Sequence, residues 1–362
     1  MKEKKYADII IVGGGPAGLA TAYCLQKLNI DCLVVEKNKV GNSWGNMPKY
    51  WRVVSPQWTN MLPGSGFPYS SPFSKPWVNS YREYLLQYSK INSIKVHEEI
   101  NIYNVLQIDN CKKFKLTSDD LDFECKIIVS ATGYYSNPYI PSLPRGDDDS
   151  IRSFHVSEYF SPERLKKLFP HCTKILIVGR RVSAGQLLTD LSKHDFSLSI
   201  SARGSVSPRD GSFKGKIKDF IYFPYEELKV KLNPNIYADS FPHMDGGKTE
   251  ELLKEKIVTV HSNIVGIRDR HVVFEDGASD KFDLIIYATG YKPSLAYLKD
   301  IVRFEDDGDM PIIKDMHCSD IENIFFIGLD QIYNFRSRYL RGIRKDAVVL
   351  ANDINVALRK IK

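Results

Sequence analysis

The sequence predicts an α/β protein in which one unit built on a parallel sheet is inserted into another. Three observations support this fold class. A pattern of strand, glycine loop, helix and strand occurs twice, each copy is later closed by an apolar strand that runs into Ala-Thr-Gly-Tyr, and the joins between the copies are rich in Pro, Gly and polar residues. Strands that alternate with helices in this way favour parallel sheets covered by helices.

The first unit, residues 8–38, reads "DIIIVGGGPAGLATAYCLQKLNIDCLVVEKN". Its apolar strand, GxGxxG loop, helix and second strand ending at Glu36 form the complete pattern of a dinucleotide-binding fold. Gly13 permits the tight turn, Gly15 lets a pyrophosphate approach the backbone, and Gly18 allows the helix to pack closely on the strand. The helix N-terminus offers free N–H groups to phosphates, and Glu36 is placed to accept hydrogen bonds from an adenosine ribose.

The second unit, residues 173–203, repeats the pattern with an altered loop, "VGRRVSAGQ". Arg181 stands at the position of the second glycine, and the position that matches Glu36 is Ala202, which is followed by Arg203. A carboxylate there repels a 2′-phosphate, whereas a guanidinium binds it, so the exchange favours NADPH, with NADH also possible. We interpret the loop as adapted, with Arg180 or Arg181 reaching a phosphate. The alternative is a loop that has lost its ligand and carries two solvated arginines.

Both units close in the same way, with "CKIIVSATGYYSNP" at 125–138 and "FDLIIYATGYKPSL" at 282–295. Two copies at similar offsets indicate a duplicated architecture. We therefore expect two Rossmann-like dinucleotide-binding domains in a glutathione-reductase-like arrangement. The outer, FAD-binding domain would comprise residues 1–150 and 291–362, and the inserted NAD(P)H-binding domain would comprise residues 151–290.

The composition is that of an ordinary globular protein. The chain has 362 residues and a formal net charge of +6, with 50 Lys and Arg spread along it, which fits an anionic small ligand as well as a nucleic acid. Its six cysteines show no C-x-x-C pair or metal spacing, so a disulfide framework, a metal site and a dithiol redox motif all lack support. No stretch is long enough for a signal peptide or a membrane span. We expect a cytoplasmic protein that acts on a small molecule, without nucleic acid or membrane partners, and possibly a homodimer.

These motifs resemble those of the two-domain flavoproteins, and among them most closely the short bacterial flavin-containing monooxygenases. The resemblance covers nearly the whole chain. The segments that carry it are "GGGPAG" (13–18) with Glu36, "VGNSWG" (40–45), "QWTN" (57–60), "IIYATGY" (285–291) and "ENIFFIGLD" (322–330). The family motif that links the two domains is half present, because "FHVSEY" keeps His155 and Tyr159 but lacks the residues due before them.

The resemblance implies FAD and NADPH as cofactors, and a flavin hydroperoxide that oxygenates a small N-, S- or carbonyl-containing substrate. By resemblance, Asn60 is the candidate hydrogen-bond donor to the oxygenating group, although it could equally cap a loop turn. The residues expected to bind the cofactors are Gly13, Gly15, Pro16, Ala17, Gly18, Glu36, Lys37, Trp44, Thr132, Gly133, Gly179, Arg180, Arg181, Ser183, Ala184, Arg203, Thr289, Gly290 and Asp330.

Several residues allow two interpretations. Tyr134 and Tyr291 could stack near the cofactors or belong to the core. For His155 and Tyr159 we favour a pair on a surface helix over a place beside the nicotinamide. The basic run "FKGKIK" at 213–218 is expected to be a solvated loop.

Two other functions compete with the monooxygenase. One is an NAD(P)H-dependent flavin or disulfide reductase; against it, the chain has no C-x-x-C, and Ala17 occupies a loop position where some thiol-disulfide reductases of this fold carry cysteine. The other is a non-catalytic FAD-binding module that has let its second nucleotide site decay, for which Arg181 is the support and Arg203 the counterargument.

Overall fold

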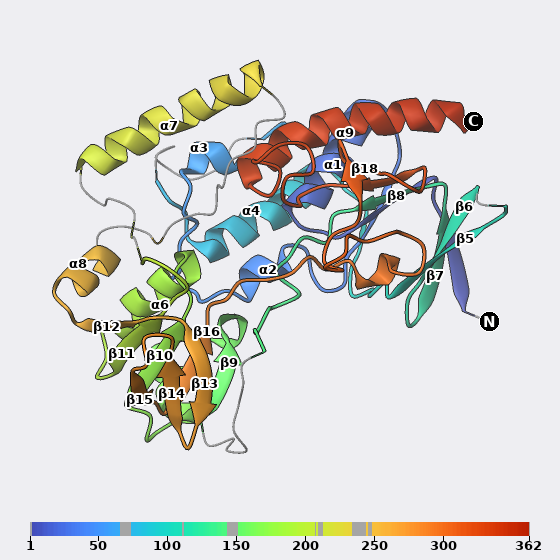
Figure 1. Cartoon of the computed structure of the whole chain (residues 1–362). Coiled ribbons are helices and arrows are strands. Elements are labelled where there is room, and N and C mark those ends of the chain that lie inside the picture. Colours follow the sequence, from blue (N-terminus) through green and yellow to red (C-terminus); the bar gives the residue numbers. More distant parts are fainter. Residues whose placement is uncertain are drawn as a thin grey trace.

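The computed structural model describes residues 2–65, 74–110, 112–142, 151–206, 208, 213–233, 244 and 248–361, with the backbone alone over 213–220. Parts of the segments 48–77 and 205–245, the link 143–150 and Cys111 therefore lie outside the described residues. The chain is a mixed α/β protein with two parallel sheets, one at the lower left of Figure 1 and one at its upper right.

The larger sheet is built from apolar strands at both ends of the chain. In order across the sheet, the strands are β17 (Ile313–Lys314), β18 (His317–Cys318), β19 (Ile324–Phe326), β8 (Ile127–Ser130), β2 (Ile9–Val12), β3 (Leu33–Val35) and β4 (Val96–His97). The run from β19 to β4 is parallel. Because both faces of these strands are covered, β2 and β8 are apolar at nearly every position and fully buried.

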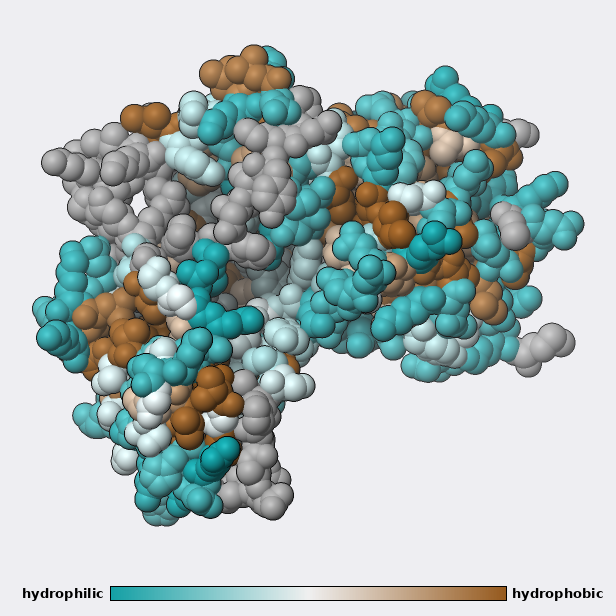
Figure 2. Space-filling model, viewed as in Figure 1, coloured by the Kyte–Doolittle hydropathy of each residue, from teal (hydrophilic) through white to brown (hydrophobic). Residues whose placement is uncertain are grey.

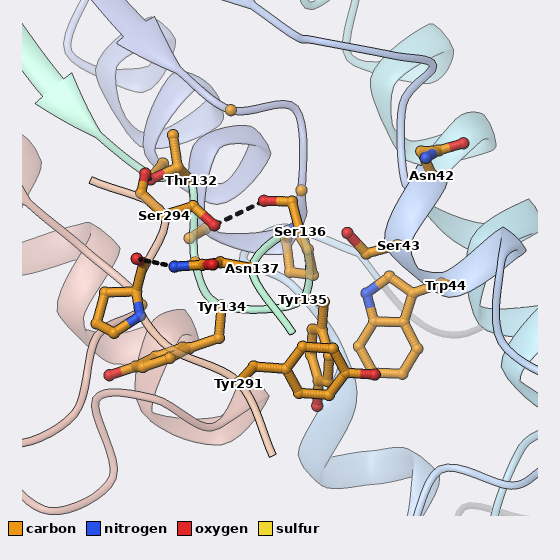
Figure 3. A pocket seen from close by; sticks show the side chains of 18 of the residues that line it. Asn42, Ser43, Trp44, Thr132, Tyr134, Tyr135, Ser136, Asn137, Tyr291 and Ser294 are labelled. Carbon is orange, nitrogen blue, oxygen red and sulfur yellow. Dashed lines mark hydrogen bonds between the residues drawn. The ribbon is translucent and has the colours of Figure 1, made fainter. Parts of the chain in front are cut away.

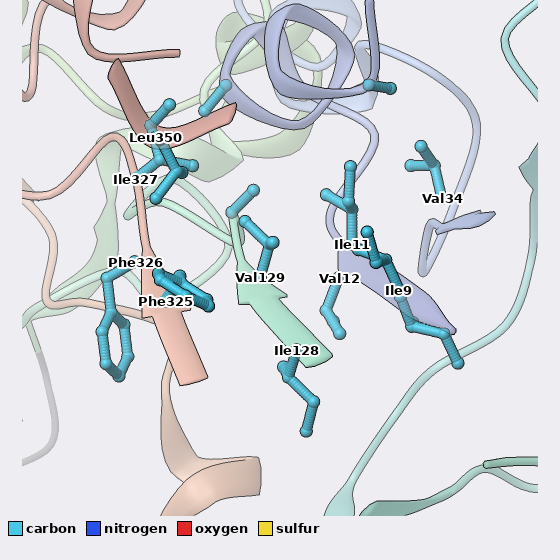
Figure 4. Packing of buried hydrophobic residues seen from close by; sticks show 14 of the residues in the cluster. Ile9, Ile11, Val12, Val34, Ile128, Val129, Phe325, Phe326, Ile327 and Leu350 are labelled. Atoms are coloured by element: carbon cyan, nitrogen blue, oxygen red, sulfur yellow. The ribbon is translucent and has the colours of Figure 1, made fainter. Parts of the chain in front are cut away.

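Two long helices cover one face of this sheet. The helix α1 (Pro16–Lys27) follows the glycine loop, and α9 (Leu340–Lys360) packs along it (Figure 1). Ile11, Val129 and Phe326 pack in the same core cluster as Leu350 of α9 (Figure 4). A separate sheet consists of β1 (Glu3–Tyr6), β7 (Leu121–Cys125), β6 (Lys113–Thr117) and β5 (Asn104–Ile108). Its strands β5 to β7 lie between β4 and β8 in the chain, whereas β1 precedes β2.

The smaller parallel sheet is built from the middle of the chain. Its strands, in order, are β12 (Val258–His261), β11 (Ser197–Ser201), β10 (Lys174–Val178), β16 (Leu284–Tyr287) and β9 (Arg152–His155). The helix α6 (Val182–Leu191) follows β10 and α8 (Lys248–Lys254) packs against it. An antiparallel sheet of β13 (Ile264–Arg268), β14 (His271–Phe274) and β15 (Ser279–Lys281) comes before β16.

The two parallel sheets repeat one contact at atomic detail. In the order β19-β8-β2-β3-β4 and in the order β9-β16-β10-β11-β12, the strand before each glycine loop lies beside the strand that ends in Ala-Thr-Gly-Tyr. Gly13 has φ +116°, and a Cβ there would come within 2.4 Å of the Ala131 carbonyl oxygen. Gly179 has φ +140°, and a Cβ there would come within 2.3 Å of the Ala288 carbonyl oxygen. The first glycine of each loop is thus required for the same steric reason, as the repeated sequence pattern predicts.

The remaining helices lie in the segments of chain between these strands. They are α2 (Asn42–Gly45), α3 (Gln57–Asn60), α4 (Val78–Ile91), α5 (Pro162–Leu168), α7 (Phe213–Leu232) and the short 3₁₀ helices Val156–Glu158 and Ala296–Leu298. The prediction of a loop at 213–218 is wrong, because these residues form the first turns of α7. Among the described residues, none of the helices combines the length and the apolar character that a membrane crossing requires.

Candidate active site

A cavity of about 920 Å³ lies where the two parallel-sheet units meet. Its walls include the first glycine loop, α2, the first Ala-Thr-Gly-Tyr segment, Tyr291 of the second and the first residues of α6. Nucleotide and substrate sites of α/β proteins lie at the carboxyl ends of the strands, and both glycine loops start there. The first predicted nucleotide loop and the start of the helix after the second, at Val182, Ser183 and Gln186, therefore border one cavity.

The first loop has room for a dinucleotide. Gly15 precedes α1 with φ −84°, and a Cβ there would meet no atom within 4 Å, so neither the backbone nor protein packing requires glycine at this position. Gly18 differs, because a Cβ there would come within 1.9 Å of the Gly13 carbonyl oxygen. The open space at Gly15 lies at the amino end of a twelve-residue helix, where unpaired N–H groups attract phosphate. This cradle fits the pyrophosphate of FAD.

Glu36 also takes part in this loop. One carboxylate oxygen accepts a hydrogen bond of 2.6 Å from the backbone N–H of Gly14, and the other accepts one of 2.9 Å from the N–H of Asn38. Glu36 and Lys37 both line the cavity. The carboxylate is therefore held in place at the end of β3, on the side of the loop where a ribose would lie.

The second loop has the same backbone with a different surface. Arg181 precedes α6 with φ −112° and ψ −167°, close to the −84° and −172° of Gly15, so the arginine fits without strain. The Arg181 side chain therefore begins at the position that is equivalent to Gly15, where the first loop leaves open space. The Arg180 guanidinium donates to the Ser205 carbonyl oxygen at 3.2 Å, which ties this loop to the segment after β11. Arg203 is exposed two residues beyond the end of that strand.

The two Ala-Thr-Gly-Tyr segments meet in the cavity. The Thr132 hydroxyl donates to the Ser294 carbonyl oxygen at 2.8 Å, and the hydroxyls of Ser136 and Ser294 lie 2.7 Å apart (Figure 3). Tyr135 and Tyr291 pack edge to face with ring centroids 5.0 Å apart. These contacts join residues about 160 positions apart in the chain and hold the first closing segment against the chain that follows the second.

An aromatic wall borders this junction. The ring of Trp44 of α2 lies 6.3 Å from that of Tyr135 (Figure 3). It also lies 4.6 Å from the ring of Tyr81 of α4. Tyr134 lines the cavity, and its hydroxyl accepts a 2.7 Å hydrogen bond from the backbone N–H of Asp330. Burial raises the pKa of Tyr134 to about 12, so it stays neutral. The Asp330 carboxylate pairs with Arg338 at 3.2 Å.

The prediction that His155 and Tyr159 form a pair on a surface helix is wrong. Both are buried, with exposed fractions of 1% and 2%. His155 Nδ1 accepts from the Ser157 backbone N–H at 3.1 Å, so its Nε2 carries the proton and donates to the Gly290 carbonyl oxygen at 2.9 Å. Burial lowers the pKa of His155, which keeps the ring neutral. His155 therefore fixes the second Ala-Thr-Gly-Tyr segment from the end of β9.

Asn60 lies behind the cavity wall in this structure. It is fully buried at the end of α3, its amide donates to the Ser55 carbonyl oxygen at 3.1 Å, and its side-chain oxygen accepts from the Ser55 hydroxyl at 2.6 Å. Ser55 lines the cavity, whereas Asn60 does not appear among the described lining residues. A donor role for Asn60 stays a prediction and would need this amide to change partner.

The predicted cofactor residues divide into two groups. Those that line the cavity are Gly13, Gly15, Pro16, Ala17, Glu36, Lys37, Trp44, Thr132, Gly133 and Ser183. Those that the cavity lining does not include are Gly18, Gly179, Arg180, Arg181, Ala184, Arg203, Thr289, Gly290 and Asp330. The sequence reasoning missed the lining residues Asn101, Gln186 and 293–297. The last group could have been suspected, because it directly follows the second Ala-Thr-Gly-Tyr segment.

Neither a metal nor a redox dithiol is built into the described part of the chain. The described residues hold no group of His, Cys, Asp and Glu suited to a metal ion. The described cysteines are free, and none appears among the described residues that line the cavity. Burial raises the pKa of Cys24 on α1 to about 11, so this thiol is unreactive near neutral pH.

Comparison with known proteins agrees with this site. The chain is 25% identical to an uncharacterised CzcO-like oxidoreductase of Geobacillus kaustophilus, over 96% of this chain and 98% of the relative. It is also 25% identical to the probable indole-3-pyruvate monooxygenase YUCCA1 of Arabidopsis thaliana, over 95% of this chain and 89% of the relative.

Solved structures share the fold. The flavin-containing monooxygenase of Stenotrophomonas maltophilia superposes with a TM-score of 0.80 at 18% identity, covering 97% of this chain and 99% of that one. The bacillithiol disulfide reductase Bdr (YpdA) of Staphylococcus aureus superposes with a TM-score of 0.73 at 21% identity, again over 97% and 99%.

The profile of one protein family matches most of the chain, from residue 10 to residue 328. This span includes both glycine loops, both Ala-Thr-Gly-Tyr segments and most of the cavity lining. FAD and NADPH are the cofactors of the flavin monooxygenases related to it, and the open cradle at Gly15 fits the first of them. The chain is thus a flavin-dependent oxidoreductase, and it belongs to the pyridine nucleotide-disulphide oxidoreductase family.

Proposed function

We propose that this protein is an FAD-dependent monooxygenase that uses NADPH and dioxygen to oxygenate a small substrate with a reactive nitrogen, sulfur or carbonyl group. The observation that carries the proposal is a cavity bordered by the first nucleotide loop and by the start of the helix after the second, walled by aromatic side chains and with no cysteine among its described lining residues. We further propose the domain division predicted above, with residues 1–150 and 291–362 binding FAD and residues 151–290 binding the nicotinamide nucleotide.

The first loop would hold FAD. The N–H groups at the start of α1 would bind its pyrophosphate, with Gly15 leaving the space for close approach. Glu36, held by Gly14 and Asn38, would accept hydrogen bonds from the ribose. Thr132 would sit beside the flavin end through its link to Ser294. When bound, FAD supplies the transfer of electrons from NADPH to dioxygen, and the protein supplies binding, orientation and exclusion of water.

The second loop would hold NADPH in a different way. Arg181 occupies the space that Gly15 leaves open, so its guanidinium, instead of bare backbone, would meet the pyrophosphate. Arg203 directly follows Ala202, the position where an NAD-binding fold carries an acid, and it would bind the 2′-phosphate. Ser183 and Gln186 face the cavity from the first turns of α6 and would orient the nicotinamide end.

The aromatic wall would keep water from the reacting groups. Trp44, Tyr135 and Tyr291 pack in sequence across the junction of the two units. His155 supports this wall, since its ring packs 4.8 Å from Tyr291 and its Nε2 holds Gly290. Water exclusion favours oxygen transfer to substrate over release of peroxide. Of the described lining residues, none forms a Ser-His-Asp triad or a carboxylate pair, and the proposed chemistry requires neither.

A disulfide reductase is the second candidate function, because a bacillithiol disulfide reductase shares the fold. The site argues against it. Ala17, at the start of α1, lines the cavity at the place where a catalytic cysteine would face the flavin. A thiol-disulfide exchange needs a thiolate, and the buried Cys24 on the same helix does not supply one. A non-catalytic FAD module would require the second loop to bind no nucleotide.

The deciding experiment supplies ¹⁸O₂ to the FAD-loaded protein with NADPH and an aryl methyl sulfide, a tertiary amine or a cyclic ketone. We expect NADPH oxidation coupled to one labelled oxygen atom in at least one product. NADPH oxidation that yields unlabelled products and peroxide with all three substrates would contradict the monooxygenase, and reduction of a low-molecular-weight disulfide would then favour the reductase. Absence of NADPH oxidation would favour the non-catalytic module.

A further inference from the structure

The helix α7 carries apolar side chains on its solvent side. Ile221, Tyr225, Leu228 and Leu232 are 60%, 52%, 53% and 78% exposed. Their spacing of four, three and four residues places them on one face of the helix, and we call these four residues the outer stripe. Figure 2 shows apolar surface along the upper edge of the molecule, where Figure 1 places α7. A stripe of this kind on a soluble surface marks an interaction site.

The opposite face of α7 is fixed to the protein. Phe223 and Val230 are buried, and the Phe223 ring packs edge to face on Trp58 at 5.7 Å. Glu226 is 2% exposed and receives two hydrogen bonds, of 2.7 and 2.8 Å, from the Arg341 guanidinium at the start of α9. Such a buried two-point ion pair fixes the rotation of the helix. The outer stripe therefore cannot turn inward without breaking this pair.

The charges beside the outer stripe are positive. Lys229 and Lys231 lie on either side of it, each about 80° around the helix from its centre. Both are exposed, and the Lys229 ammonium lies 4.9 Å from the Tyr225 ring. The acids of this part of the helix, Glu226 and Glu227, are paired with arginines and a lysine of the 336–345 segment. An apolar stripe flanked by lysines fits a surface that is apolar inside and negatively charged outside.

We propose that α7 binds in the plane of an anionic lipid membrane, with the outer stripe among the acyl chains and Lys229 and Lys231 at the headgroups. Amphipathic helices with this arrangement bind membrane interfaces without crossing them. A second copy of the chain suits the stripe less well. Four side chains on one helix offer much less than the roughly 1,200 Å² that a stable interface buries, and they offer no acid to pair with the lysines of a partner. The proposal differs from the expectation of no membrane partner, which rested on the absence of spanning segments.

Vesicle sedimentation tests the proposal on the intact FAD-loaded protein. We expect binding to vesicles of phosphatidylcholine and phosphatidylglycerol in equal amounts, and weak binding to phosphatidylcholine alone. Lys229→Gln/Lys231→Gln should lower the partition coefficient for anionic vesicles by roughly 30-fold, since each lysine near such a surface contributes roughly fivefold. Lys167→Gln/Lys314→Gln, which changes two exposed lysines elsewhere, should leave it unchanged.

Apolar variants provide the second arm. Ile221→Ser/Leu228→Ser should abolish vesicle binding, whereas Val356→Ser, at a residue of α9 that is 54% exposed, should not. In a Tyr225→Trp variant, lipids brominated on the acyl chains should quench the added fluorescence. Circular dichroism and FAD content verify that each variant is folded. Equal binding to neutral and anionic vesicles, or no binding to either, would overturn the proposal. Loss of a dimer in Ile221→Ser/Leu228→Ser without vesicle binding by the unaltered protein would assign the stripe to a second copy instead.

Discussion

Replacing Gly15 by alanine separates the structural glycines of the first loop from the one that serves a ligand. A methyl group at Gly15 meets no protein atom within 4 Å and the backbone φ of −84° suits alanine, so the flavin-free protein should lose at most about 1 kcal/mol of unfolding free energy, for the poorer helix cap. At Gly18 the same change brings the methyl group within 1.9 Å of the Gly13 carbonyl oxygen, which should cost roughly 3 kcal/mol or more.

The effect on FAD should run in the opposite order. If pyrophosphate approaches the backbone at Gly15, the added methyl group displaces charge-assisted hydrogen bonds that contribute roughly 1.5–3 kcal/mol, and FAD affinity should fall by roughly 10- to 150-fold. Flavin fluorescence titration of the flavin-free protein measures this, and urea unfolding of the same samples measures stability. Arg181→Ala, at the same place in the second loop, is the matched control and should leave FAD affinity unchanged. Wild-type FAD affinity in Gly15→Ala would refute the assignment of the first loop.

Three further predictions follow from the second loop and from buried ionisable groups. Arg203→Ala should raise KM for NADPH by roughly 10- to 100-fold and leave KM for NADH unchanged. Arg180→Ala should affect both nucleotides equally, because the Arg180 guanidinium is bonded to Ser205. Equal effects of Arg203→Ala on both nucleotides would contradict a contact between Arg203 and the 2′-phosphate. Burial lowers the pKa of His155 below its ordinary 6.5, so the unfolded chain takes up a proton at a higher pH than the folded protein does. The unfolding free energy should therefore fall as pH drops below about 6.5. Urea unfolding across this range should show a shallower fall in His155→Gln than in the unaltered protein. Burial raises the pKa of Asp346 from 3.8 to about 6, so its ionisation opposes folding increasingly as pH rises from about 3.8 to about 6 and by a constant amount above that. Asp346→Asn should therefore raise the unfolding free energy by up to roughly 3 kcal/mol at about pH 8 and by about 1 kcal/mol at about pH 4.5. A gain independent of pH would exclude the carboxyl group as the cause.

Local patterns in the sequence predicted the parts of this protein that local geometry determines. The strands and helices around Gly13 and Gly179 follow from apolar runs and from glycines with one backbone conformation each, so both were predicted at the right residues. The position of Glu36 after β3 follows from the same spacing. These features depend on neighbours in sequence.

Features that depend on distant contacts were missed or placed wrongly. The burial of His155 depends on Gly290, far along the chain, so a single histidine motif could not reveal it. The junction of Thr132 with Ser294 likewise brings together two segments that the sequence showed as separate copies.

The shared cavity also bears on the order in which ligands arrive. At about 920 Å³ it is near the upper end of the range for one ligand pocket, roughly 300–1,000 Å³, and under the proposed function it would receive the flavin, the nicotinamide and a substrate. The first loop and the start of α6 border this one space. Under the proposed function, the reductant and the substrate would therefore share the space beside the flavin. We expect the two to compete for it, so that an excess of either should slow turnover with the other.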